Sequence, residues 1–206
     1  MITFKKNFLV FILILFAACN ANNASIAVAT KKEKPLVIFQ PINNFPSAIL
    51  KFLKDSVEKF YPVKVEINAP KTFPINAYYK PRNRFGADSI INWLPKIKPE
   101  HARTIIALTN DDISETKGST EDYGIMGLGF QPGAACVVSD FRLHANNPSE
   151  KQLRERIFKT VIHELGHNFG LPHCADTNCI MADKKGKLTQ DKENGLCENC
   201  RRKVRI

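Results

Sequence analysis

The sequence predicts an α+β fold in which one mixed, twisted β-sheet carries packed helices. Short apolar runs typical of buried strands alternate with longer segments whose apolar residues recur at helical spacing. The expected order is β-α-β-α-β-β-β-α, which suits helices packed on a sheet. About 170 residues follow Lys34, enough for one domain with a single core.

Each predicted element rests on a local pattern. Short apolar runs predict strands at residues 36–39, 104–108 and 135–138, and alternation of apolar and polar residues predicts one at 63–67. The glycine-containing segment 124–130 is expected to be an edge strand. Helices are expected at residues 46–60, 87–94 and 149–169, the second ending before Pro95. Residues 68–85 are rich in Pro, Asn and Lys and predict a loop.

The longest predicted helix has a clear beginning and a clear buried face. Ser149 and Glu150 are favourable residues at a helix N-terminus. An apolar stripe follows at helical spacing, formed by Ile157, Val161, Leu165 and Phe169. This stripe predicts that the helix packs on the sheet.

Residues 163–173, at the end of that helix, read HELGHNFGLPH. His163 and His167 are four residues apart, so both imidazoles lie on one helix face, where one zinc ion can bind both. Glu164 points elsewhere on the helix and can address a water molecule rather than the metal. Gly170 permits a sharp turn that returns His173 as a third ligand. The fourth position stays open, as a catalytic zinc site requires.

The cysteines that follow form a second candidate metal site. Their spacing is C-x4-C followed by C-x2-C, at Cys174, Cys179, Cys197 and Cys200. Four thiolates can form a closed structural zinc site, and C-x2-C is a common zinc spacing. Two disulfides are the alternative if the chain is exported to an oxidising compartment.

The combined pattern HExxHxxGxxH-C-x4-C-x-M, with C-x2-C further on, resembles the archaemetzincin family of zinc metallopeptidases. A looser similarity covers residues 84–94 and 135–143. The resemblance implies a metzincin-like fold with a small four-cysteine zinc subdomain at the C-terminus, and two zinc ions, one catalytic and one structural. It also implies that Met181 is the Met-turn residue beneath the catalytic zinc. Fifteen residues separate Met181 from Cys197, slightly fewer than expected for the family, which shortens one loop.

The resemblance implies that the protein hydrolyses peptide bonds, with a peptide or protein as substrate and Glu164 as the general base. A catalytically inactive, zinc-stabilised binding protein of the cell envelope is the alternative. Glu164 argues against it, because a purely structural metal site has no use for that carboxylate.

The N-terminus predicts export. Lys5 and Lys6 precede an apolar run of about 11 residues, as in a signal peptide. Residues 15–19 read LFAAC and resemble a bacterial lipobox, which predicts a signal peptide over residues 1–18 and a lipid anchor on Cys19. Residues 19–34 are expected to be a flexible tether, and residues 35–206 the peptidase domain. Cleavage after Ala29 and a secreted soluble product are the alternative.

The remaining features receive ordinary interpretations. The formal net charge is +10, but export separates the basic C-terminus from nucleic acid, so no nucleic-acid partner is expected. We expect a monomer attached to the membrane of the bacterial cell envelope through its lipid anchor. His101 and His144 are expected on the surface, and Cys136 in the core.

Overall fold

The computed structural model describes residues 33–206. Their centre is a five-stranded sheet in the order β2-β1-β5-β9-β8. The strands are β1 (Leu36–Pro41), β2 (Lys64–Ile67), β5 (Thr104–Thr109), β8 (Gly127–Gly129) and β9 (Ala135–Ser139). The first four strands of the sheet are parallel and β8 is antiparallel to β9, so the expected mixed sheet is confirmed.

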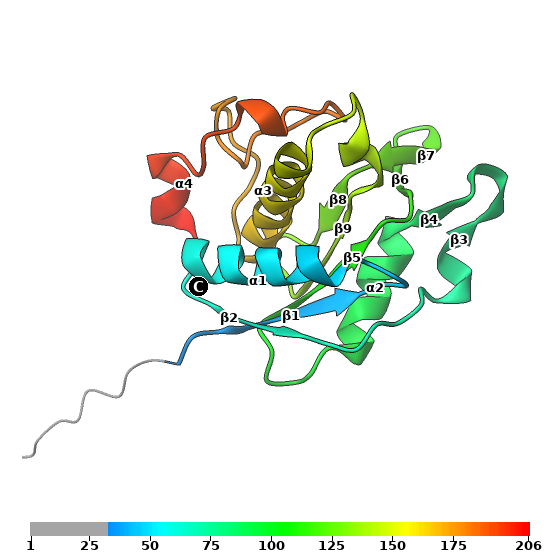
Figure 1. Ribbon diagram of the computed structural model, residues 1–206, viewed down its shortest axis with the longest axis horizontal. Helices are drawn as coiled ribbons and strands as arrows, with labels where there is room; N and C mark the ends of the chain where they lie inside the picture. The colour runs from blue at the N-terminus through cyan, green and yellow to red at the C-terminus, as the bar shows by residue number, and fades with distance from the viewer. Residues whose placement is uncertain (1–32) are drawn as a thin grey trace, which may run out of the picture. The chain divides into compact units, whose positions relative to one another are not determined.

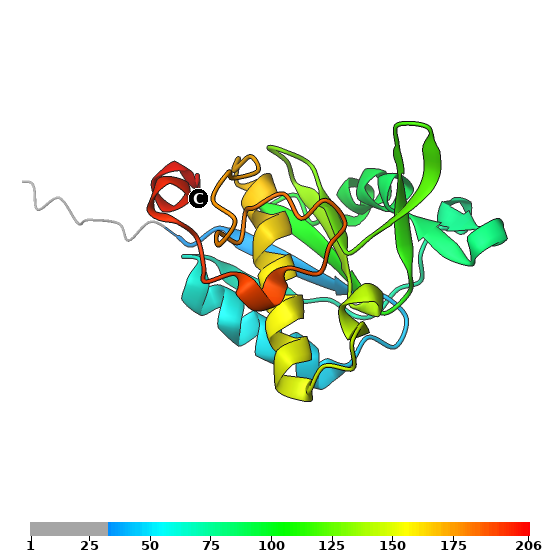
Figure 2. The same cartoon turned by 90° about the horizontal axis from the view of Figure 1, so that it is seen from above.

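Helices cover both faces of this sheet (Figures 1 and 2). The helices α1 (Ser47–Phe60) and α3 (Glu150–Asn168) pack on one face, and α2 (Ala87–Ile97) packs on the other. Because successive side chains of a strand point to opposite faces, Val37 and Phe39 join the core under α1 and α3, whereas Ile38 joins the core under α2.

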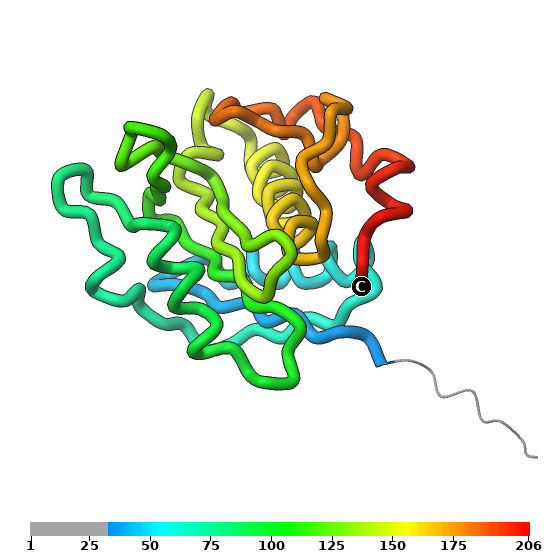
Figure 3. The backbone as a smooth tube through the Cα atoms, turned by 180° about the vertical axis from the view of Figure 1, so that it is seen from behind, coloured from blue at the N-terminus to red at the C-terminus, as the bar shows by residue number. Residues whose placement is uncertain are grey.

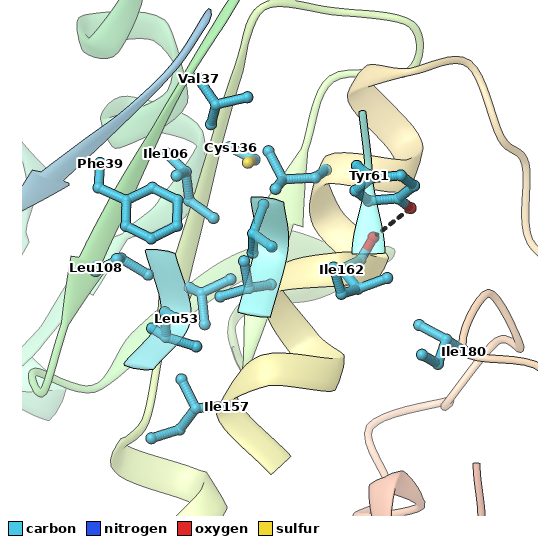
Figure 4. Packing of buried hydrophobic residues seen from close by; sticks show 14 of the residues in the cluster. Val37, Phe39, Leu53, Tyr61, Ile106, Leu108, Cys136, Ile157, Ile162 and Ile180 are labelled. Atoms are coloured by element: carbon cyan, nitrogen blue, oxygen red, sulfur yellow. Dashed lines mark hydrogen bonds between the residues drawn. The ribbon is translucent and has the colours of Figure 1, made fainter. Parts of the chain in front are cut away.

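The core beneath α1 and α3 fixes the position of the long helix (Figure 4). The predicted stripe of α3 is fully buried, and so is Leu53 of α1. Tyr61, at the end of α1, donates a hydrogen bond from its hydroxyl to the Ile162 carbonyl oxygen at 3.2 Å. Its ring also meets Phe169 edge to face at 5.1 Å. Apolar packing with one directional bond therefore fixes α3 against α1.

A second sheet was missed by the sequence patterns. It has the order β3-β4-β6-β7, formed by β3 (Tyr78–Tyr79), β4 (Arg84–Gly86), β6 (Ile113–Lys117) and β7 (Thr120–Ile125). Residues 68–85 are thus not only loop: they contain β3, β4 and the 3₁₀ turns Ile75–Ala77 and Lys80–Arg82. The predicted edge strand 124–130 is divided between β7 and β8. The strands of the second sheet are short and mostly lack an apolar pattern, so they are defined by their pairing with one another.

The end of α2 differs from the prediction, whereas the start of α3 agrees with it. The helix α2 continues past Pro95 to Ile97: the last turn still closes, because the Lys98 N–H bonds to the Leu94 carbonyl oxygen at 3.0 Å. The helix α3 begins as predicted, with a capping box in which the Ser149 side chain and Gln152 satisfy each other's backbone N–H groups.

The C-terminal segment runs along α3 and ends in α4 (Glu198–Lys203), as Figure 3 shows from behind. The buried Arg156 forms two hydrogen bonds to Asp191, at 2.7 and 2.8 Å. Lys159 donates to the carbonyl oxygens of Gln190 and Glu193, both at 2.7 Å. These contacts hold the 3₁₀ turn Gln190–Lys192 on the helix that carries the candidate metal ligands.

The expected signal peptide 1–18, Cys19 and most of the expected tether 19–34 lie outside the described residues. Within residues 33–206, no helix is both long enough and apolar enough to cross a membrane.

Candidate active site

His163 and His167 lie on the last two turns of α3 and point their Nε2 atoms at each other. The Nδ1 atom of His163 lies 2.6 Å from the Ile180 carbonyl oxygen, and that of His167 lies 2.8 Å from the Leu171 carbonyl oxygen. A carbonyl can only accept, so both Nδ1 atoms carry the proton. Both Nε2 lone pairs are therefore free, and these atoms are 3.1 Å apart.

The turn after α3 brings the third histidine to the same place. Gly170 has φ +91°, a conformation that glycine adopts without strain. The Leu171 N–H bonds to the Gly166 carbonyl and the Gly170 N–H to the His167 carbonyl, which together form a Schellman motif. His173 follows, and the candidate ligand atoms of the three histidines lie within 4.8 Å of one another. The structure thus brings together the three histidines that the sequence predicted as zinc ligands.

The chemistry of these groups fits a zinc ion. Burial lowers the pKa of His163 well below its usual range and also lowers that of His167, so both imidazoles are neutral. Two unprotonated Nε2 atoms that face each other have no proton to share, so their lone pairs repel, and a cation bound between them removes that repulsion. Tetrahedral zinc with Zn–N bonds of about 2.0–2.1 Å places ligand nitrogens roughly 3.3 Å apart, close to the observed separation.

Glu164 lies beside these histidines, pressed against the edge strand β8. Its side chain is buried, and burial raises its pKa to about 8, while Lys184 opposes the shift. A Cβ atom added at Gly127 would lie 2.6 Å from Glu164 Oε1, and one at Gly129 would lie 3.2 Å from the Glu164 carbonyl oxygen. The two glycines of β8 therefore allow the sheet edge to approach Glu164 closely.

A cleft of about 260 Å³ opens over these groups. Its walls come from three parts of the fold: α3, the strands β6 to β8, and the loop after Met181. Residues that the sequence reasoning did not single out line it, including Met126, Thr160 and Lys184.

The four cysteines expected to bind metal also come together. Their sulfur atoms lie within 4.8 Å of one another, and those of Cys174 and Cys197 are 3.7 Å apart. All four are free thiols, so the structure contains neither of the alternative disulfides. Zn–S bonds of about 2.3 Å place sulfur atoms roughly 3.8 Å apart in a tetrahedron, so the cluster fits zinc. A hydrogen bond from the Cys200 backbone N–H lowers the pKa of the Cys197 thiol to about 7, which favours the thiolate.

The two clusters are joined by residues 179–181. Cys179 belongs to the cysteine cluster, and the next residue, Ile180, offers the carbonyl that fixes His163. Met181 follows, fully buried, and its carbonyl accepts from the Cys174 N–H at 2.7 Å. His173 and Cys174 are also adjacent in the chain, so the two clusters are connected twice. No sequence pattern indicated the connection through Ile180, because it uses a backbone carbonyl.

The two remaining histidines and the remaining cysteine lie where the sequence predicted them, on the surface and in the core. His101 and His144 are exposed, and Cys136 is completely buried in the core.

A mixed sheet with helices on both faces, and a helix whose two histidines converge with a third from the turn after it, are the features expected of a zinc metallopeptidase. The model of peptidase family M54 matches residues 42–206. The chain is 31% identical to an archaemetzincin of Pyrococcus furiosus over 182 residues, which is 83% of this chain and 93% of that protein. It is 28% identical to an archaemetzincin of Halobacterium salinarum, covering 80% and 96%.

Solved structures of the same family are similar. A crystal structure of an archaemetzincin from Methanopyrus kandleri matches with a TM-score of 0.72 at 26% identity, covering 85% of this chain and 98% of the other. An archaemetzincin from Archaeoglobus fulgidus, complexed with malonate, matches with a TM-score of 0.70 at 27% identity, covering 82% and 99%. The chain belongs to peptidase family M54, the archaemetzincins, and acts on peptides or proteins.

The close approach of β8 to Glu164 generates a prediction. Gly127→Ala places a methyl group where the Glu164 carboxyl now lies, so that carboxyl must move. We expect peptide hydrolysis to fall by about 10²-fold, since a displacement of about 1 Å can cost that much. Gly86→Ala is the matched control, because its Cβ would meet its nearest neighbour at 3.7 Å, an ordinary contact. Steady-state kinetics of both variants check this; unchanged activity in Gly127→Ala would contradict it.

Proposed function

We propose that His163, His167 and His173 hold the catalytic zinc ion of this peptidase and that Glu164 is its general base. The observation that carries the proposal is the pair of buried, unprotonated Nε2 atoms 3.1 Å apart, with His173 beside them and Glu164 next to His163 in the chain. The exposed side of this trio opens into the cleft, which leaves room for water and substrate.

A bound zinc ion supplies Lewis acidity, which brings the pKa of a water molecule toward about 7 and polarises the scissile carbonyl. Glu164 then accepts a proton from the attacking water and delivers it to the amine that leaves. Burial raises the pKa of Glu164, while the positive charge of Lys184 opposes that shift and a zinc ion at the histidines would oppose it further, so the side chain can both accept a proton and return it.

The edge strand β8 supports a mode of substrate binding. It is the last strand of its sheet and forms part of the cleft wall next to Glu164. The backbone on the side of β8 away from β9 has no strand partner within residues 33–206. An extended peptide can add to this edge as a further strand, which would present its backbone carbonyl to the zinc site.

We further propose that Cys174, Cys179, Cys197 and Cys200 hold a second, structural zinc ion. Four thiolates fill a tetrahedral site and leave no position for substrate. Together with Met181, which packs under Gly166, this site would support the catalytic ligands. Membership of peptidase family M54 argues against the alternative of an inactive zinc-stabilised binding protein.

We also propose that the protein is a monomer in the bacterial cell envelope, attached to the membrane by a lipid on Cys19. The sequence of residues 1–19 supports the export and the lipid attachment.

Glu164→Gln tests the proposed mechanism. The amide cannot accept a proton, so hydrolysis should fall by about 10²–10⁴-fold while zinc binding at the histidines persists. Glu155→Gln, an exposed change on the same helix, should leave activity unchanged. Kinetics and elemental analysis provide the measurements. Full activity in Glu164→Gln would remove Glu164 from the mechanism.

The connection between the two clusters gives a second prediction. Cys197→Ser together with Cys200→Ser should lower thermal stability and also weaken zinc binding at the histidines, because Ile180 and His173 are both held next to the cysteine cluster. The affinity loss should be about 10–100-fold, the usual effect of losing a group that orients a ligand. Competition with a chelator measures it.

The control for that variant is Cys136→Ala, which alters a buried cysteine outside the cluster. It should lower stability without changing zinc affinity at the histidines. A double variant that melts earlier but binds the catalytic zinc as tightly as before would show that the cysteine site acts alone.

The proposed anchor is tested in bacterial cells that process lipoproteins. Labelled fatty acid should be incorporated into the natural chain, and Cys19→Ser should abolish that incorporation and release the protein from membranes. Processing that Cys19→Ser leaves unchanged would instead favour cleavage after Ala29 and a secreted product.

A further inference from the structure

Much of the domain's excess positive charge is gathered in its last residues. The formal net charge of +10 falls to +6 for residues 33–206, because residues 1–32 contain four lysines and no acid. Residues 196–206 contain Arg201, Arg202, Lys203 and Arg205 but a single acid, Glu198, so half of that excess lies there. All four cations are exposed and together form a basic surface.

The fold fixes this basic surface in place. The helix α4 carries three of its four cations and contains Cys200 of the cysteine cluster. Beyond α4, the Arg205 N–H donates to the Phe169 carbonyl oxygen at 3.1 Å. Val204 and Ile206 pack against the core beneath α1 and α3. The cations are therefore presented by a packed segment rather than by a loose tail.

Most of this charge is not neutralised within the domain. Arg202 pairs with Glu198 at 2.9 Å, but both side chains are exposed, and such pairs contribute little. Arg201 donates to a backbone carbonyl oxygen at 2.9 Å, which does not cancel its charge. Neither Lys203 nor Arg205 forms an ion pair within residues 33–206. The surface can therefore attract an anionic partner.

The basic surface lies at the end of the domain where the described chain begins. The Leu36 carbonyl oxygen, at the start of β1, accepts from the Arg103 N–H at 2.8 Å. The Arg103 guanidinium lies over the Phe169 ring, 5.8 Å from its centroid, and Phe169 in turn binds the backbone of Arg205. Figures 1 and 2 show the start of β1 and the C-terminus at the same end. Arg103 adds a further cation there.

The length of chain before the domain limits how far this end can lie from a membrane. Residues 20–32 separate Cys19, the proposed site of the lipid, from Glu33, and a chain of that length spans at most roughly 50 Å. A short connection of this kind gives an effective concentration in the millimolar range. Weak attraction between a few cations and anionic headgroups is then sufficient to hold this end against the lipid.

We propose that this basic surface, formed by Arg201, Arg202, Lys203 and Arg205, binds the anionic phospholipid headgroups of the membrane that carries the protein. The contact orients the domain, because the C-terminal segment and the start of β1 then both face the lipid. The proposal rests on the envelope location proposed above, but it does not require a lipid on Cys19. Nucleic acid, another polyanion, is disfavoured because the predicted export separates it from the chain.

Vesicle binding by residues 20–206 tests the proposal. This part lacks the apolar run and Cys19 but contains the whole domain, since 85% of the chain covers 98% of the archaemetzincin from Methanopyrus kandleri. The zinc-loaded protein should sediment with vesicles that contain phosphatidylglycerol and not with vesicles of phosphatidylcholine alone. The binding should disappear in 1 M salt, where the Debye length is about 3 Å.

Two double variants remove equal charge from opposite ends of the domain. Lys203→Gln/Arg205→Gln should weaken vesicle binding about 25-fold, since each cation near the surface contributes about fivefold. Lys71→Gln/Lys80→Gln removes two exposed lysines near β3, at the other end, and should change binding little (Figure 1). Thermal melting and peptide hydrolysis, which neither variant should alter, show that both fold. If the first does not fold, Arg202→Gln/Lys203→Gln replaces it.

The outcomes separate this proposal from that of the lipid anchor. Equal binding to neutral and anionic vesicles, or equal losses in the two double variants, would overturn the role of the basic surface. Binding of double-stranded DNA without binding of vesicles would overturn it as well. Failure of Cys19 to incorporate labelled fatty acid, with vesicle binding intact, would overturn the anchor alone. Incorporation without vesicle binding would overturn the basic surface alone.

Discussion

The hydrogen bond from His163 Nδ1 to the Ile180 carbonyl is the contact on which the site depends most. It fixes the tautomer and the direction of His163, and thereby turns the Nε2 atom toward that of His167. The carbonyl is held in turn because Ile180 is buried and lies between Cys179 of the cysteine cluster and the buried Met181. One short backbone segment therefore connects the cysteine cluster to the orientation of a proposed zinc ligand, His163.

The helix α3 is confined from two directions, and each contributes a part of the active site. On one side, the glycines of β8 let the sheet edge approach Glu164. On the other, Arg156 and Lys159 hold the C-terminal segment along the helix, and this segment carries Lys184 into the cleft. The proposed general base and the proposed zinc ligands are thus positioned by packing around a single helix.

Much of this arrangement could be predicted from local patterns. The histidine spacing, Gly170 and the cysteine spacing each encode geometry within a few residues, and the apolar stripe of α3 identified its buried face. The second sheet could not be predicted, because β6 and β7 are polar and depend on pairing. The roles of the Ile180 carbonyl and of Gly127 depend on contacts between segments far apart in the chain, which a local spacing does not reveal.

The most direct measurement is anomalous diffraction at the zinc edge from crystals of the purified protein, with its thiols kept reduced. The account predicts two zinc peaks, with Ile180 still accepting the His163 hydrogen bond. One peak should lie among the imidazoles and the other among the sulfur atoms of the residues named here: His163, His167 and His173, and Cys174, Cys179, Cys197 and Cys200. A single peak, or a second metal bound away from the four sulfur atoms, would contradict the claim that two connected zinc sites build this active centre.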